Sequence, residues 1–281
     1  MVNLKNEFLN LTISKKGAEI VKATNSDGKD IIWIGDKKFW QDHSPVLFPV
    51  CGSLLNDKYS YNGKEYSMPK HGFAKESLFE VETVTDNAAV FLLKANEESL
   101  KIYPFLFELR IKYTLLDKTV RVDYIIDNKG ENEMYFSIGA HEGYMCERVE
   151  DCFIEFDNPV TVKSQKLTGP LLNGNCEDVI ENATVLPLKS DKYWTYDLIF
   201  KDIDFTAVTL KNKNGKIVRA EFAGFSNLLI WSLPDAPYVC IEPWSGLPDY
   251  IDSDGLIKNK ISITSLAPYS KCSFTHSFSL D

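Results

Sequence analysis

The sequence predicts an all-β protein, built as a large antiparallel sandwich or barrel. Three observations support this class: apolar and polar residues alternate with a period of two, Asn-Gly dipeptides separate alternating stretches, and helical periodicity is scarce. Gly and Pro also interrupt the chain at short intervals, as in proteins made of many short strands. Because no linker, composition shift or fixed-period repeat is visible, we expect one domain over residues 1–281.

The clearest pair of strands lies near the middle of the chain. Apolar residues alternate with charged ones over residues 107–113 and again from residue 120, until Ile125 breaks the pattern. The short connection Leu115–Lys118 joins the two stretches. This pattern predicts an antiparallel hairpin with one buried face.

Two Asn-Gly dipeptides predict further hairpins. Asn62-Gly63 and Asn214-Gly215 each lie between two alternating stretches. Asn and Gly adopt positive φ at low cost, which a type I′ turn requires at both central positions. The alternation over residues 274–278 predicts another strand near the C-terminus.

Composition excludes several classes of protein. With 31 Lys+Arg against 40 Asp+Glu, the net charge is −9, which argues against a nucleic-acid surface. Hydrophobic residues make up 44% and charged residues 25%, so the chain is globular rather than disordered. Apolar runs such as Pro45–Cys51 are far shorter than the roughly 20 residues of a membrane-spanning helix, so we expect no membrane contact.

The cysteines and the first residues favour a cytoplasmic protein. Six cysteines are scattered without a C-x-x-C pair, and the N-terminal residues lack a basic region followed by an apolar one. We therefore expect reduced thiols.

Motifs for cofactor and metal chemistry are missing. The sequence contains no dinucleotide-binding glycine motif, P-loop, H-E-x-x-H zinc motif or G-x-S-x-G elbow. Residues 249–254 are acidic but lack the spacing of a calcium loop, so we expect a solvated turn there. An enzyme with this sequence is expected to use acid/base chemistry with no cofactor and no metal.

Four histidines can be weighed by their surroundings. His71 and His141 stand beside glycines at strand ends, where reactive groups usually project, although a structural role stays open for both. His43 precedes an apolar run and has a weaker claim to function. His276 shares a strand face with two phenylalanines, which favours a core or edge position.

Glu242 is the best candidate for a base. It follows the apolar run Tyr238–Ile241 and precedes Pro243-Trp244. Burial next to a Trp raises the pKa of a carboxyl group and makes it a better base near neutral pH. The alternative is a structural Glu that pairs with an Arg or caps backbone amides.

Seven short segments, individually weak, are specific in their order and combination. They are Pro45–Gly52, Tyr61–Tyr66, His71–Ala74, Tyr103–Phe105, Ser137–His141, Ile230–Ser232 and Ile241–Trp244. In this order the sequence resembles the aldose 1-epimerase (galactose mutarotase-like) superfamily, and within it the LacX-like group. The resemblance runs almost from end to end.

The resemblance implies a galactose mutarotase-like β-supersandwich that interconverts the α and β anomers of an aldohexose. Its partner would be a small-molecule sugar, free or phosphorylated, and the protein would be a monomer or homodimer. Glu242 matches the general base at the C1 hydroxyl, His141 the general acid at the ring oxygen, and His71 a second histidine near that oxygen. Asp197 matches an aspartate that binds sugar hydroxyls. Trp244 or Trp231 could offer an apolar platform, although core packing is expected for Trp231.

The sequence departs from the family pattern at two places. Ser53 stands where relatives usually carry an Arg that contacts the sugar, and a hydroxyl cannot replace a guanidinium at the same reach. Glu142 follows His141 where LacX-like relatives commonly have Pro; we expect a solvated turn residue, with a role in binding as the alternative. Lys70 and Lys75 flank His71 and are expected to be ordinary surface residues.

Two other functions stay open at this stage. The missing Arg favours a non-catalytic carbohydrate-binding or sugar-sensing protein. A glycosidase would need a second carboxylate facing Glu242, and Asp197 and Asp249 are the tempting partners.

Overall fold

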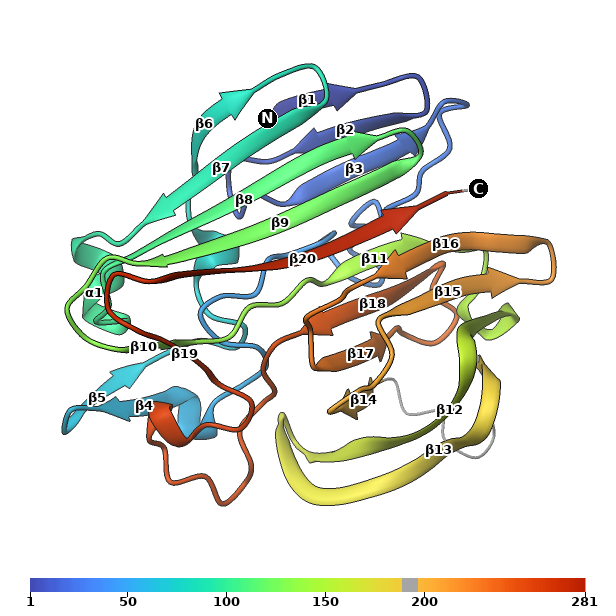
Figure 1. Cartoon of the computed structure of the whole chain (residues 1–281). Helices are drawn as coiled ribbons and strands as arrows, with labels where there is room; N and C mark the ends of the chain where they lie inside the picture. The colour runs from blue at the N-terminus through green and yellow to red at the C-terminus, as the bar shows by residue number, and fades with distance from the viewer. Residues whose placement is uncertain (189–196, 281) are drawn as a thin grey trace.

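The computed structural model describes residues 1–188 and 197–280. Within these residues the chain forms one thirteen-stranded antiparallel sheet, a three-stranded sheet and two two-stranded sheets (Figure 1). The described part has a single α-helix, α1 (Glu97–Ile102). The predicted all-β antiparallel class is therefore confirmed. No helix in the described residues is long and apolar enough to span a bilayer.

The thirteen-stranded sheet has two halves joined through one long strand. The first half runs in the order β6 (Glu80–Val84), β7 (Ala88–Lys94), β8 (Phe107–Leu116), β9 (Thr119–Asn128), β20 (Lys271–Ser279), β16 (Gly215–Glu221) and β15 (Ala207–Asn212). The second half continues as β12 (Cys152–Thr168), β14 (Asp197–Lys201), β17 (Asn227–Trp231), β18 (Tyr238–Trp244) and β11 (Glu142–Met145), with β13 (Leu171–Pro187) paired to β12.

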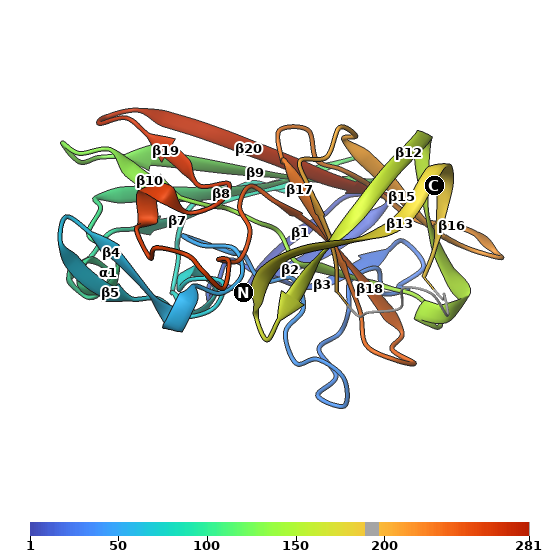
Figure 2. The same ribbon diagram turned by 90° about the horizontal axis from the view of Figure 1, so that it is seen from below.

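Strand β12 connects the two halves by pairing with them at different ends. Its first residues, 152–155, pair with β15, while Ser164 further along pairs with β14. The hairpin β12–β13 therefore passes from the outer sheet to the strands that carry the site. Seen from below, this hairpin crosses β17 and β18 (Figure 2).

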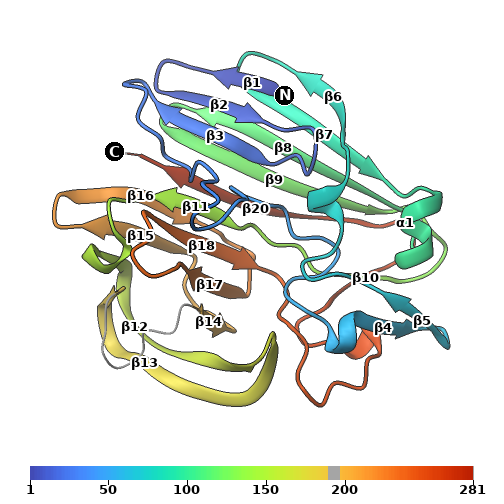
Figure 3. The ribbon, with the colours of Figure 1, turned by 180° about the vertical axis from the view of Figure 1, so that it is seen from behind.

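Smaller elements cover the large sheet. The three-stranded sheet packs on one face of β7–β9, where the Tyr113 hydroxyl donates to the carbonyl of Ala18 at 2.7 Å (Figure 3). The small sheets are β1 (Val2–Lys5), β2 (Leu9–Ile13) and β3 (Ile20–Asn25); β4 (Lys58–Tyr61) and β5 (Lys64–Ser67); and β10 (Met134–Phe136) and β19 (Thr264–Leu266). Single helical turns are η1 (Leu55–Asp57), η2 (Ala74–Glu76), η3 (Val149–Asp151) and η4 (Ile257–Asn259).

The predicted hairpins are present, with one difference in turn geometry. Strands β8 and β9 pair along their full length and bury alternate residues, as the sequence predicted. Asn62 and Gly63 both have positive φ, 49° and 77°, as a type I′ turn needs. The type I′ prediction is wrong for Asn214-Gly215. There only Gly215 has positive φ, and it already pairs with Asn212 as the first residue of β16.

A buried hydrogen bond ties the two halves of the sheet together. Glu142 on β11 and His276 on β20 are 3% and 2% exposed, and their Oε1 and Nε2 atoms lie 3.0 Å apart. The Tyr124 ring stacks on His276 at 5.6 Å. The core position expected for His276 is confirmed, but the solvated turn expected for Glu142 is wrong. Because strand neighbours point to opposite faces, Glu142 points into the core whenever His141 faces outward.

This pair makes a double-mutant prediction about stability. Glu142→Leu or His276→Leu leaves a buried polar partner without its hydrogen bond, so we expect each to lower the free energy of unfolding by about 3 kcal/mol. The double Leu variant removes both polar groups and is expected to lose clearly less than the sum. Urea unfolding measures all four proteins. Additive losses would show that the two side chains do not depend on each other.

Candidate active site

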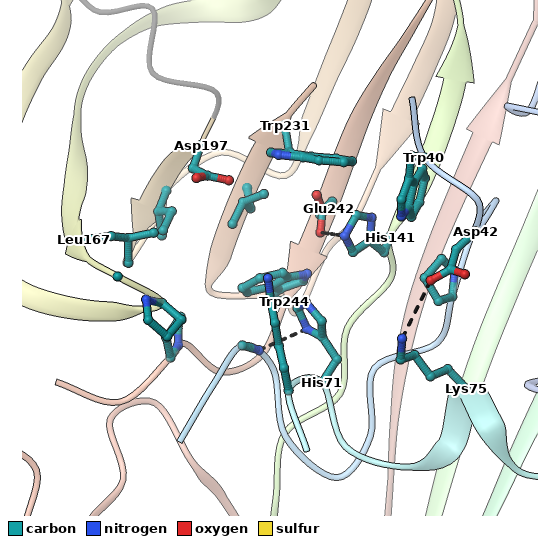
Figure 4. A pocket seen from close by; sticks show the side chains of 18 residues that line it. Trp40, Asp42, His71, Lys75, His141, Leu167, Asp197, Trp231, Glu242 and Trp244 are labelled. Atoms are coloured by element: carbon teal, nitrogen blue, oxygen red, sulfur yellow. Dashed lines mark hydrogen bonds and ion pairs between the residues drawn. The ribbon is translucent and has the colours of Figure 1, made fainter. Parts of the chain in front are cut away.

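A cavity of about 540 Å³ opens beside the second half of the sheet (Figure 4). This volume lies within the range of small-molecule sites. Strands β14, β17 and β18 form its floor, the tip of the β12–β13 hairpin forms one wall, and loops around residues 40–52 and 70–75 form the other. The lining residues are Trp40, Asp42, Pro45, Gly52, Lys70, His71, Lys75, His141, Leu167, Gly169, Pro170, Asp197, Ile199, Leu229, Trp231, Glu242, Trp244 and Pro248.

Strand register brings His141 and Glu242 face to face. Glu142 pairs with Ile241, and Gly139 pairs with Trp244, so His141 stands directly opposite Glu242 across β11 and β18. Side chains opposite each other on one face of a sheet are in contact distance. The His141 Nε2 atom lies 3.2 Å from Glu242 Oε2. The sequence separates these residues by a hundred positions, and the sheet makes them neighbours.

The Glu242 carboxylate is fully buried and has few partners. Its exposed fraction is 0%, and both of its oxygens lack a hydrogen bond, as does Nδ1 of His141. The 3.2 Å approach of Glu242 to His141 is therefore a close contact that lacks hydrogen-bond geometry. Among the described residues, no Arg or backbone amide donates to this carboxylate, which excludes the structural alternative considered from the sequence.

Burial shifts the ionisation of this pair toward the neutral forms. Desolvation, with the nearby Asp197 carboxylate, raises the pKa of Glu242 well above its usual range. Desolvation also lowers the pKa of His141 to about 3. Both shifts have the same cause, because a low-dielectric site disfavours charge. In the free protein both groups therefore favour their uncharged forms.

His71 is held rigidly by the backbone of Gly52. Its amide N–H donates to the Gly52 carbonyl at 2.9 Å, and its Nδ1 accepts from the Gly52 N–H at 3.1 Å. The second bond leaves the proton on Nε2, so the ring offers a donor at its free end. Burial lowers the pKa of His71 well below its usual value, and the neighbouring His141 lowers it further.

The backbone at His71 is strained to reach this position. His71 has φ of +66° and Gly72 has φ of +73°. A Cβ at residue 72 would lie 2.1 Å from the carbonyl oxygen of Phe48, so only glycine fits there. Positive φ in a non-glycine residue is uncommon and gathers at functional sites.

Trp40 belongs to the site but was not predicted from the sequence. Its ring stacks on His141 at 4.9 Å and 28°. Both ends of the loop that carries Trp40 are hydrogen-bonded to Gly143. The Trp33 N–H donates to the Gly143 carbonyl, and the Gly143 N–H donates to the His43 carbonyl. A Cβ at Gly143 would lie 3.2 Å from the Trp40 ring. In the sequence, Gly143 indicates that another segment packs closely against this position, but it does not show that the segment carries Trp40.

Two more tryptophans and an aspartate complete the inner cavity. Trp231 and Trp244 lie on either side of Glu242, and Asp197 lies next to Trp231 (Figure 4). Trp231 packs against two buried apolar clusters, as expected, and its ring also lies on the cavity face, 5.8 Å from the His141 ring. Trp244 contacts His71 at 5.5 Å, and its Nε1–H donates to the Ala140 carbonyl at 3.2 Å. Burial raises the pKa of Asp197.

Two lysines and an aspartate lie at the cavity mouth. Lys70 and Lys75 line it, although the sequence predicted ordinary surface positions for both. Lys75 pairs with Asp42 at 3.6 Å, and Lys70 stays exposed.

Ser53 and Asp249 lie behind the cavity wall rather than in it. Ser53 is buried and is not one of the lining residues. Asp249 was expected in a solvated turn, but it is buried and paired with Lys260 at 2.9 Å, and it accepts from the Leu55 N–H at 2.9 Å. The neighbouring Pro248 lines the cavity. A glycosidase partner for Glu242 is therefore not available from Asp249.

The fold and the site together define a class: an antiparallel β-sheet protein that holds a buried His–Glu pair in an open cavity lined with aromatic rings. The profile of the aldose 1-epimerase family matches residues 1–254, and the chain belongs to this family of sugar isomerases. Its fold is the galactose mutarotase-like β-supersandwich. The family resemblance inferred from the sequence is confirmed.

Several relatives support this assignment over nearly the whole chain. Protein LacX encoded on a plasmid of Lactococcus lactis subsp. lactis is 33% identical over 95% of both chains. A galactose mutarotase related enzyme from Lactobacillus acidophilus superposes with a TM-score of 0.92 and 31% identity, covering 99% of this chain and 96% of that one. A galactose mutarotase-like protein from Lactobacillus casei gives 0.94 and 28% over both full chains.

The buried carboxyl group predicts how stability changes with pH. The raised pKa means that folded Glu242 keeps its proton more firmly than unfolded Glu242, so this residue's contribution to stability is full below its ordinary pKa of 4.5 and is lost as pH rises. Glu242→Gln has no such loss. We expect the melting temperature of the variant to gain on the wild type between about pH 5 and pH 8.

Differential scanning calorimetry across this range tests the prediction, with Glu7→Gln as a control that removes an exposed carboxylate. A difference between Glu242→Gln and wild type that stays constant with pH, or shrinks as pH rises, would contradict it.

Proposed function

We propose that this protein is a mutarotase that interconverts the α and β anomers of an aldohexose by acid/base ring opening and closure. The observation that carries the proposal is the His141–Glu242 pair, 3.2 Å apart at the floor of an open cavity. The family to which the chain belongs supports the same reaction class.

The reaction needs two proton transfers at adjacent oxygens. The Glu242 carboxylate takes the proton of the C1 hydroxyl, the bond between C1 and the ring oxygen breaks, and His141 gives its proton to that oxygen. The product is an open-chain aldehyde. After rotation about the C1–C2 bond, the same hydroxyl attacks the other face of the aldehyde, and both protons return. No proton or electron is gained or lost overall.

The ionisation of the pair suits this cycle. Ring opening starts from a carboxylate and an imidazolium and ends with a carboxylic acid and a neutral imidazole. Burial favours the second state, so the cavity stabilises the protonation state reached when the ring is open. Sugar hydroxyls that bind Glu242 would supply the hydrogen bonds that its two oxygens lack and so support the ionised state at the start.

The remaining cavity residues take supporting roles in this proposal. His71 points a fixed Nε2–H toward the same space and donates to the ring oxygen. Asp197 accepts from sugar hydroxyls, while Trp244 and Trp231 offer apolar faces on either side of Glu242. Ser53 was the expected replacement for a sugar-binding Arg, but its buried position supports at most an indirect role.

Optical rotation tests the proposed reaction directly. Wild-type protein is expected to speed the decay of rotation of freshly dissolved α-D-glucose or α-D-galactose. Glu242→Gln and His141→Asn are expected to slow catalysis by about 10²–10⁴-fold, because each removes one proton-transfer group. The control is His43→Gln, which changes a histidine outside the cavity lining.

The same proteins separate catalysis from simple binding. If calorimetry detects sugar binding while wild type leaves the spontaneous rate unchanged across several aldoses and their 6-phosphates, the protein is a sugar-binding protein and the mutarotase proposal fails. Equal loss in His43→Gln would also count against it, since that variant keeps the pair intact.

A further inference from the structure

A third potential ligand atom lies next to the acid/base pair. Among the described residues, His141, Cys240 and Glu242 bring one imidazole nitrogen, one sulfur and one carboxylate oxygen within 4.8 Å of one another. Cys240 and Glu242 are two positions apart on β18, so their side chains share the face that meets His141. Neither Cys240 nor its thiol has a role in the proposed isomerisation.

His141 and Glu242 both have buried polar atoms without a hydrogen-bond partner. Glu242 is completely buried, yet neither of its oxygens accepts a hydrogen bond, and Nδ1 of His141 is also unpaired. Buried carboxylates normally have donors, because an unpaired buried charge is costly. A ligand that supplies positive charge at this point would satisfy atoms that the protein leaves open.

The donor set matches one class of cation. A thiolate, an imidazole and a carboxylate are the ligands of Zn²⁺, and three protein ligands with one open position are typical of its non-structural sites. Here the open position would face the cavity. Zinc–ligand distances of about 2.0–2.3 Å place tetrahedral ligands about 3.5 Å apart, so the longest of the three separations, at most 4.8 Å, has to shorten by up to about 1.3 Å.

The surroundings of Cys240 favour a soft cation over a hard one. The residue is fully buried and packs among aromatic side chains, including Trp33 and Tyr238. Hard cations such as Mg²⁺ and Ca²⁺ prefer oxygen ligands and retained water, which this pocket of rings does not offer at the sulfur.

We propose that His141, Cys240 and Glu242 form a binding site for Zn²⁺ or a similar thiophilic divalent cation. Binding displaces the thiol proton of Cys240 and the carboxyl proton of Glu242, both of which pass to solvent, and the cation then occupies the lone pairs that Glu242 and His141 need for proton transfer. The metal and the sugar therefore compete for the same cavity floor. This competition makes the cation an inhibitor, a consequence that rests on the proposed mutarotase function, whereas the binding itself does not.

Cobalt absorption provides a readout that does not depend on activity. Co²⁺ bound through a thiolate gives a charge-transfer band and tetrahedral d–d bands, and Zn²⁺ removes both. We expect these bands in wild type and their loss in Cys240→Ala, with metal affinity reduced at least about 100-fold, because even second-shell changes cost 10–100-fold.

Cys51→Ala is the matched control. Cys51 is as deeply buried as Cys240 and packs against Trp244 at the cavity wall, but its sulfur is not part of the cluster. This variant is expected to keep the cobalt bands. Identical titrations of wild type and Cys240→Ala, or a spectrum without a thiolate band, would overturn the proposal.

Sugar and metal titrations then separate the two proposals. Inhibition of mutarotation by Zn²⁺ and its reversal by excess sugar or chelator are expected if both hold. Cobalt bands in a protein that never speeds mutarotation would sink the proposed function and leave the metal site standing. Normal mutarotation without cobalt bands would overturn the metal site and leave the proposed function standing.

Discussion

The pairing register of β11 with β18 is the constraint on which the rest of the site depends. It sets His141 opposite Glu242 on the cavity face and, by alternation, sends Glu142 into the core to meet His276. A slip of one residue would reverse every one of these directions. Strand β11, which directly follows His141, is therefore held in place by a buried hydrogen bond to β20, a distant strand of the same sheet.

The cavity combines rigid placement with low polarity. Two hydrogen bonds to Gly52 fix His71. The loop that carries Trp40 is hydrogen-bonded at both ends to Gly143 of β11. Aromatic rings contact His141, and both oxygens of Glu242 lack a hydrogen-bond donor. A hydrogen bond from a ligand to these oxygens would be strengthened by the low polarity of the surroundings.

Local patterns predicted the strands well and the site in part. The alternation in β8 and β9 depends on neighbours along the chain, so it could be interpreted directly. The position of Glu142 could not: whether a polar residue faces water or core depends on which sheet half folds over it. Asp249 was misjudged because its partner Lys260 lies eleven residues further along the same connection between β18 and β19, and no local pattern shows that this connection folds back on itself. Trp40 packs closely against Gly143, where a side chain would crowd its ring, and so reaches His141. This packing joins segments about a hundred residues apart in the sequence, which local patterns do not show.

The three indoles of the cavity have an optical consequence. Trp40, Trp231 and Trp244 make up three of the five tryptophans in the chain, and two of these rings touch His141. Indole emission shifts with local polarity and is quenched by a protonated imidazole in contact. The molecule thus contains its own reporter: its ultraviolet fluorescence follows both the filling of the hollow and the charge on that imidazole, with no added dye.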